Sequence, residues 1–274
     1  MRVEKPIGWL LLLWPTLIAL WLAGEGQPDA SIVWIFVAGV FVMRCAGCVI
    51  NDYADRDIDP AVDRTRTRPL AAGDLRPQQA LGLFIILSSI ALLLLLQLPM
   101  PVWPWAVPAM GLTIIYPFMK RLIQAPQLVL GMAFSFGIPM AYVALEHPFD
   151  SPFWLLLLTN LVWVVMYDTA YAMSDREDDL KIGVNSTAIL LGAYDRLAIG
   201  LAQLTILILL LAIMLQAGLT VVFLWSLLLV SCLFVYQQYL IRARDRADCF
   251  AAFINNGWVG AIIWFGLVLA LPQN

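Results

Sequence analysis

The sequence predicts an all-α integral membrane protein with nine transmembrane helices. Hydrophobic residues make up 62% of its 274 residues and charged residues only 13%, and the mean hydropathy is +0.85. Soluble domains are about 45–50% apolar and about 25% charged, so a water-soluble domain and a disordered chain are both excluded. The net charge of −3 also excludes a nucleic-acid-binding protein that relies on a basic surface, and we expect no nucleic acid partner.

Nine apolar runs are each close to the roughly 20 residues that a helix needs to cross the hydrocarbon core. Helix-breaking residues separate them: Pro28 follows the first run, and Pro99 and Pro101 form a turn between the third and the fourth. The runs cover about 6–23, 31–50, 78–98, 101–119, 126–145, 152–174, 194–216, 219–241 and 249–271.

The basic residues indicate which side faces the cytoplasm. With nine spans, all 16 Lys and Arg residues fall on the side of the N-terminus or within a turn or two of it. The opposite loops hold only five titratable residues: Glu25, Asp29, Glu146, His147 and Asp150. By the positive-inside rule, the N-terminus and the long charged loops are cytoplasmic and the C-terminus is periplasmic.

Two acidic clusters lie on the predicted cytoplasmic side. The first follows the second run and offers an amide and three carboxylates: Asn51, Asp52, Asp55 and Asp59. The second lies at and beyond the end of the sixth run and offers five carboxylates: Asp168, Asp175, Glu177, Asp178 and Asp179. On a helix, Asp52, Asp55 and Asp59 would share one face, and Asp175 and Asp179 form an i, i+4 pair. Like charges at this spacing repel, so a cation should lie between them.

These clusters are typical of a magnesium site. Oxygen ligands without neighbouring His or Cys suit Mg²⁺. The alternative is a pair of solvated polar loops. The clusters also resemble copies, because Asp55-Arg56-x-x-Asp59 and Asp175-Arg176-x-x-Asp179 share one pattern. We therefore expect a single polytopic domain of two related four-helix halves, about 6–119 and 126–241, plus the ninth helix. Such duplication is also found in transporters.

Opposed carboxylates could hold two Mg²⁺ ions, which would neutralise a diphosphate and make it a leaving group. A diphosphate site at the mouth of an apolar bundle indicates a substrate with a long hydrocarbon tail, such as a polyprenyl diphosphate. Six basic residues lie at the right depth for its phosphates: Arg64, Arg66, Arg68, Lys120, Arg121 and Lys181. Arg44 lies inside the second run, three turns before Asp55 and on the same face. A charge within a span tends to mark a buried site, where it could pair with a carboxylate of a second substrate.

Motifs at these positions carry a family resemblance that runs from residue 2 to about 196. They are N-D-x-x-D-x-x-x-D at 51–59, D-R-T-x-x-R-P-L-A at 63–71, Y-D-T-x-Y-A-M-x-D-R-x-D-D at 167–179 and K-I-G-x-x-S-T-A at 181–188. In these motifs the chain resembles the UbiA superfamily of intramembrane aromatic prenyltransferases, and most of all its bacterial branch that acts on 4-hydroxybenzoate.

The resemblance implies nine helices around a central cavity in the bacterial inner membrane, with a polar cytoplasmic cap and a lateral opening to membrane lipid. Mg²⁺ and diphosphate would be bound on one wall by the first cluster and on the other by the DxxxD pair: Asn51, Asp52, Asp55 and Asp59, then Asp175 and Asp179. The remaining substrate contacts that it implies are Arg44, Arg68, Tyr116, Lys120 and Asp168, and Lys181 joins them from the motif at 181–188.

The implied activity is the transfer of a polyprenyl group from polyprenyl diphosphate to 4-hydroxybenzoate, in ubiquinone biosynthesis. The group would join the ring carbon ortho to the hydroxyl, diphosphate would leave, and Asp55 or Asp175 would take the ring proton. Two alternatives remain: a related enzyme with a naphthoate, homogentisate or haem acceptor, and a cation-coupled transporter. Transporters usually carry carboxylates near mid-membrane, whereas these gather at one face. The sequence predicts no particular oligomeric state.

Overall fold

The computed structural model describes residues 1, 3–61 and 65–272, and within them every regular element is a helix. The three 3₁₀ turns are η1 (Asp59–Ala61), η2 (Met100–Val102) and η3 (Gly192–Tyr194). The α-helices are α1 (Ile7–Ala23), α2 (Ala30–Ala54), α3 (Pro77–Leu95), α4 (Trp103–Met119), α5 (Pro126–Ser135), α6 (Gly137–Ala144), α7 (Ser151–Ile182), α8 (Thr187–Leu191), α9 (Asp195–Gln216), α10 (Phe223–Leu240) and α11 (Arg246–Ala270).

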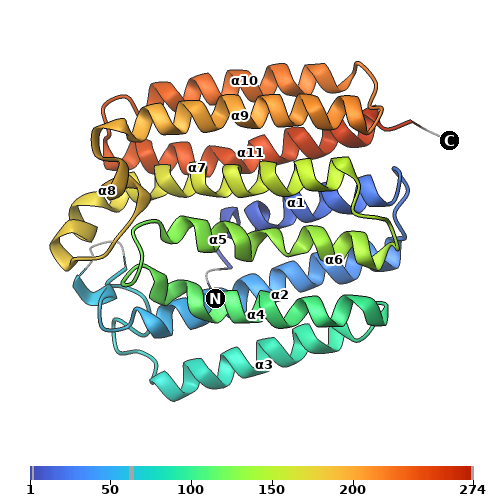
Figure 1. The fold of residues 1–274 in the computed structure, drawn as a ribbon. Helices are drawn as coiled ribbons and strands as arrows, with labels where there is room; N and C mark the ends of the chain where they lie inside the picture. The colour runs from blue at the N-terminus through green and yellow to red at the C-terminus, as the bar shows by residue number, and fades with distance from the viewer. Residues whose placement is uncertain (2, 62–64, 273–274) are drawn as a thin grey trace.

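The long helices run side by side in one bundle, with α8 and several connecting loops gathered at one end (Figure 1). In the described residues, eight segments are long and apolar enough to cross a membrane, and α1 is a shorter apolar helix of 17 residues. Two of the eight segments each consist of two consecutive α-helices: α5 with α6, and α8 with α9. Each of the nine predicted runs therefore corresponds to one segment, and the prediction of an all-α membrane protein is confirmed.

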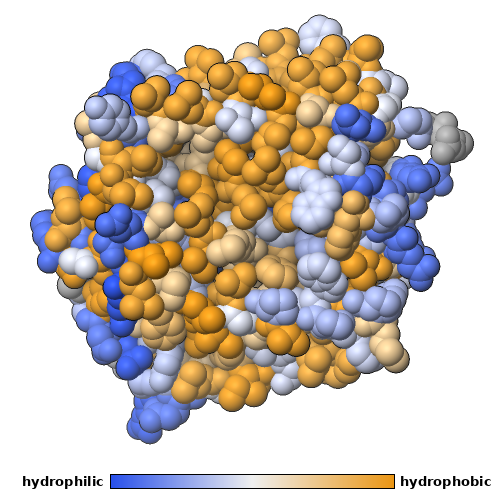
Figure 2. All heavy atoms as spheres, viewed as in Figure 1, coloured by the Kyte–Doolittle hydropathy of each residue, from blue (hydrophilic) through white to orange (hydrophobic). Residues whose placement is uncertain are grey.

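Apolar side chains cover the middle of the bundle, and polar ones gather toward its two ends (Figure 2). The most exposed apolar residues include Trp34, Val107 and Leu215, each about 70% exposed or more. A surface of this kind is stable in contact with lipid tails rather than with water. The chain is a polytopic membrane protein.

Helix α7 departs from the sequence prediction in a way that matters for the site. The sixth run was expected to end near 174, but α7 continues to Ile182, where Gly183 adopts a left-handed conformation with φ of 72° and ends the helix. Glycine carries no Cβ penalty in that conformation. Asp175 and Asp179 therefore lie on a helix, one turn apart, and not in a loop as predicted.

At the end of helix α2, by contrast, the predicted helical face of acidic residues extends beyond the helix itself. The helix ends at Ala54, and Asp55 is its C-cap. Asp59 begins the separate turn η1, so the expected helical face through Asp52, Asp55 and Asp59 does not continue as far as Asp59. Aspartate and asparagine are weak helix formers, and this stretch contains several of them. The first acidic group is thus built partly on a helix end and partly on the turn that follows.

An ionic cluster fixes the end of α7 that carries the second acidic group. Asp195, at the start of α9, is fully buried and pairs with Arg176 of α7 and with Arg244 of the α10–α11 loop, the latter at 2.8 Å. Arg246 of α11 pairs with Asp178 of α7 at 3.0 Å. These contacts join three helices at one point, because each basic residue comes from a different segment from its acidic partner.

We expect the substitution Asp195→Ala to destabilise the folded protein by about 2–3 kcal/mol, because two arginines would lose a buried counter-charge. The unfolding midpoint in detergent solution measures the change. The exposed Asp74 offers a matched control, since Asp74→Ala should leave the midpoint close to that of the unchanged protein. Equal midpoints for the two variants would contradict the role of the cluster.

Candidate active site

A cavity of about 1220 Å³ brings the two acidic groups together. Its walls come mainly from α1, α2, α3, α4, α5 and α7. The members of both acidic groups line it: Asn51, Asp52, Asp55, Asp59, Asp168, Asp175 and Asp179. Four predicted substrate contacts also line it: Arg44, Arg68, Tyr116 and Lys120. Residues more than 100 positions apart in the sequence therefore share one site.

The first acidic group forms a compact wall where α2 ends. Asp52, Asp55 and Asp59 are each buried, with 8% or less of the residue exposed. The Asp59 amide donates to the Asp55 carbonyl over 2.8 Å, and the Asn51 side-chain amide donates to Asp55 Oδ2 over 3.3 Å. The turn after α2 thus folds Asp59 back toward the helix end.

Basic side chains supply the cations that these carboxylates require. Arg68 Nη1 lies 2.7 Å from Asp59 Oδ2 and 3.2 Å from Asp52 Oδ1, so one guanidinium joins both acids. Lys120 Nζ lies 2.9 Å from Asp55 Oδ2. Arg121, next in the chain, donates to the Ala54 carbonyl over 2.7 Å. The sequence prediction that a cation lies between the acids therefore agrees with the structure, and the chain itself provides it.

Ion pairing and burial shift the pKa in opposite directions, both at Asp59 and at Lys120. Burial raises the pKa of Asp59, and the pairing with Arg68 offsets only part of that rise. Burial also acts to lower the pKa of Lys120, but Asp55, Tyr171 and Asp179 together outweigh burial and raise that pKa above the ordinary value. Lys120 is therefore held as a cation beside the acidic wall.

The second acidic group lies along one face of α7. Asp168, Tyr171, Asp175 and Asp179 recur every three or four residues and all line the cavity, as expected for positions that share a helical face. Asp178 points elsewhere, toward Arg246. Lys181 is not among the lining residues, and its side chain is 72% exposed. Two positions beyond Asp179, it lies about 200° further around the helix, so the structure does not bring it into the site.

Some residues of the site were not singled out by the sequence. Gln127, at the start of α5, accepts a hydrogen bond from the Thr187 amide over 3.0 Å, and the Asn185 amide donates to the Lys120 carbonyl over 2.8 Å. Both residues line the cavity. These contacts hold the segment after α7 against α4 and α5. Only the motif at 181–188 could have indicated Asn185. Asp63 and Arg64, of the motif at 63–71, lie outside the described residues.

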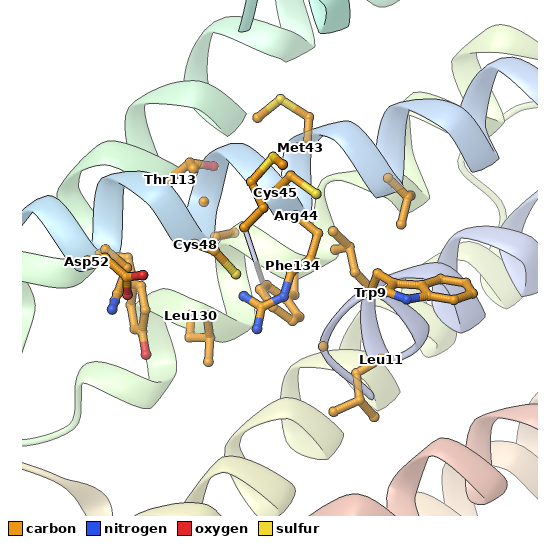
Figure 3. Close-up of a pocket in the computed structure, with 18 of the residues that line it drawn as sticks. Trp9, Leu11, Met43, Arg44, Cys45, Cys48, Asp52, Thr113, Leu130 and Phe134 are labelled. Carbon is orange, nitrogen blue, oxygen red and sulfur yellow. The ribbon is translucent and has the colours of Figure 1, made fainter. Parts of the chain in front are cut away.

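Arg44 occupies the apolar part of the cavity. Figure 3 shows its guanidinium reaching from α2 toward Leu130 and Phe134 of α5 and Leu11 of α1. Among the described residues it forms no ion pair with a carboxylate. A cation in apolar surroundings without a partner is energetically unfavourable. The arrangement therefore favours a negatively charged ligand at this end of the cavity.

The donor set on the two walls suits a hard divalent cation. Within the described residues, no three His, Cys, Asp or Glu side chains are close enough to hold a metal ion by themselves. Asp55 Oδ1, however, is buried and accepts no hydrogen bond from the described residues; Arg121 Nη2 lies 3.7 Å away from it. Mg²⁺ usually binds through one or two carboxylates together with substrate phosphates rather than in an all-protein cage. The residues present fit that mode of binding.

Comparison with known proteins identifies the family. Residues 12–266 match the model described as the UbiA prenyltransferase family. The chain belongs to this family. It is 57% identical to the 4-hydroxybenzoate octaprenyltransferase of Tolumonas auensis, over 98% of this chain and 94% of that one. It is 51% identical to the protein of the same name from Serratia proteamaculans, over 100% and 94%. The resemblance drawn from the motifs is confirmed.

Solved structures of the family share the fold. The apo structure of a UbiA homologue from Aeropyrum pernix K1 superposes with a TM-score of 0.84 at 23% identity, over 98% of both chains. A UbiA homologue from Archaeoglobus fulgidus bound to GPP and Mg²⁺ gives 0.73 at 15% identity, also over 98% of both chains. The nine-segment bundle is therefore the fold of the family.

Removing the guanidinium at position 68 should destabilise the protein when Mg²⁺ is absent. We expect Arg68→Met to lower the stability measured in EDTA by about 1–2 kcal/mol, since Asp52 and Asp59 lose their shared counter-charge. Mg²⁺ added with inorganic diphosphate should restore part of the loss. The unfolding midpoint measures both effects.

Lys181→Met is the control for this experiment, because Lys181 is an exposed cation at the same end of the bundle. It should change the midpoint little with or without Mg²⁺. If Arg68→Met were as stable in EDTA as this control, the bridging role of Arg68 would be refuted.

Proposed function

We propose that this protein transfers a polyprenyl group from polyprenyl diphosphate to the ring carbon ortho to the hydroxyl of 4-hydroxybenzoate, with release of diphosphate. One observation carries the proposal: a single cavity holds two acidic groups at its polar end and, in its apolar part, an arginine that forms no ion pair with any residue the structure describes. The names of relatives at 51–57% identity support this acceptor, and favour an octaprenyl donor.

The polar end suits the diphosphate. Bound Mg²⁺, two ions in our proposal, would neutralise the diphosphate and so assist its departure. Asn51, Asp52, Asp55 and Asp59 would hold metal on one wall and Asp175 and Asp179 on the other. The cations of Arg68 and Lys120, now paired with those acids, would turn to the phosphate oxygens. The Archaeoglobus homologue bound to GPP and Mg²⁺ supports the same assignment.

The apolar part of the cavity suits the prenyl chain and the acceptor. Most of the lining residues of α1, α4 and α5 are apolar, among them Leu11, Met110 and Phe134, and such a lining would exclude water and so protect an allylic cation from hydrolysis. Arg44 would bind the carboxylate of 4-hydroxybenzoate, and its position about three turns before Asp55 leaves room for the aromatic ring between the two. Tyr116 of α4 and Asp168 of α7, which both line the cavity, would contact the acceptor.

The carbon–carbon bond would form when the electron-rich ring attacks the first carbon of the prenyl group as the bond to diphosphate breaks. The ring then loses the proton of the attacked carbon. Asp55 and Asp175 are the carboxylates that we propose as general base. Both are buried, at 2% and 7% exposed, and both line the cavity.

The distribution of basic residues supports an orientation in the bacterial inner membrane. We propose that the N-terminus and the acidic end of the bundle are cytoplasmic and the C-terminus periplasmic. The two acidic groups would derive from two related four-helix halves, about 6–119 and 126–241, with α11 added. The acidic end would then open to the compartment that contains the water-soluble acceptor.

The mass of the product tests the function directly. Purified protein in lipid is incubated with octaprenyl diphosphate, 4-hydroxybenzoate and Mg²⁺, and the lipid extract is analysed by mass spectrometry. We expect octaprenylated hydroxybenzoate and an equal amount of released diphosphate, and EDTA should abolish both. Product formed only from a naphthoate, homogentisate or haem acceptor would change the proposed acceptor. The absence of diphosphate release with every acceptor would instead favour a transporter.

Loss of either proposed base should nearly abolish turnover. We expect Asp55→Ala and Asp175→Ala to lower kcat by about 10²-fold or more, the effect expected when a general base or a metal ligand is removed. Membrane insertion should remain normal. Asp57→Ala is the matched control, because Asp57 lies in the same acidic stretch but its side chain is 77% exposed and, among the described residues, pairs with Arg56. Wild-type turnover by either active-site variant at saturating Mg²⁺ would disprove the two-wall assignment.

A further inference from the structure

Gly8, in the first turn of α1, lies directly against the guanidinium of Arg44. A Cβ atom placed at Gly8 would lie 2.5 Å from Arg44 Nε, 2.5 Å from Nη2 and 2.9 Å from Cζ. Contacts below 3.0 Å are essentially never seen for a real Cβ. No residue larger than glycine therefore fits at position 8 while Arg44 keeps its position.

Helix α1 has little freedom to move away from Arg44. On its other side it packs closely against α11, where a Cβ at Gly257 would lie 2.9 Å from Ile7 Cδ1 and one at Gly260 would lie 2.3 Å from Trp14 Cδ1. Because α1 contacts both α2 and α11, it is confined between them. A methyl group at position 8 would thus be accommodated by displacing the end of the Arg44 side chain.

The guanidinium of Arg44 is not held in place by a carboxylate of any described residue. Its labelled neighbours in Figure 3 are mainly apolar: Trp9, Leu11, Cys48, Leu130 and Phe134. Its location is set by the space around it, and Gly8 provides the part of that space next to the charged group. This is unlike Lys120 and Arg68, whose carboxylate partners define where they lie.

We propose that Gly8 is a positioning residue for the acceptor: the missing side chain at position 8 places the Arg44 guanidinium where it binds the carboxylate of the aromatic acid. The inference rests on the proposed function, since it needs Arg44 to bind that carboxylate. A side chain at position 8 pushes the guanidinium along the cavity and weakens binding of the acid. The diphosphate end, at the opposite end of the cavity, is unaffected.

The test is a double-substitution cycle with Gly8→Ala and Arg44→Met, alone and combined. We expect Gly8→Ala to raise the KM for 4-hydroxybenzoate about 10- to 100-fold, as for the loss of a charge-assisted hydrogen bond. The KM for polyprenyl diphosphate and the Mg²⁺ dependence should change little. In the Arg44→Met background, Gly8→Ala should cause no further loss. Equilibrium binding of radiolabelled 4-hydroxybenzoate gives the same comparison for any variant with low turnover.

Gly39→Ala is the matched control, because Gly39 also lines the cavity and a Cβ there meets no atom within 4 Å. It should bind the acid as the unchanged protein does. An unchanged KM in Gly8→Ala, or an undiminished effect of Gly8→Ala in the Arg44→Met background, would overturn the inference. If Arg44→Met itself left acceptor binding unchanged, the proposed acceptor site would fail, whereas the product of the unchanged protein would still test the reaction.

Discussion

The structure depends on one constraint: buried carboxylates need positive charges close to them. Asp52, Asp55 and Asp59 lie together at one helix end with 8% or less of each exposed, and such a group is stable only with cations nearby. Arg68 and Lys120 satisfy it in the structure. We infer that substrate and metal exchange places with these side chains, so the charges that keep the site folded are the ones that later hold the phosphates.

The second acidic group is held in place in a different way from the first. Arg176 occupies the same place in the shared D-R-x-x-D pattern as Arg56, but it pairs with the fully buried Asp195, whereas Arg56 pairs with the exposed Asp57 and stacks on Tyr53. The second acidic group therefore sits on a helix that other segments fix in place. The first sits on a turn held by the residues of the site itself. Ligand binding should consequently change the first wall more than the second.

The helix bundle was predictable from the sequence, because a helix that spans lipid must be long and apolar, and because proline and glycine mark the ends of the spans. Sequence analysis also located the acidic groups, since their spacing is local. It did not predict the pairing of Arg68 with Asp59 or of Arg244 with Asp195, because these contacts depend on how separate segments fold over one another. Lys181 was predicted from its depth and from the motif at 181–188, but neither takes account of the helical register that turns it away from the cavity lining. The close approach of Gly8 to Arg44 could not be predicted either, because it depends on how two helices pack against each other.

The length of α7 has a consequence for how the two reactants meet. Its 32 residues span about 48 Å at 1.5 Å per residue, well beyond a hydrocarbon core of about 30 Å. The aspartates near its far end therefore stand at the level of the lipid headgroups, where water and membrane interior adjoin. At that depth a charged diphosphate can stay beside water while its hydrocarbon chain stays in lipid, so only the aromatic acid would have to enter the apolar part of the cavity to reach Arg44.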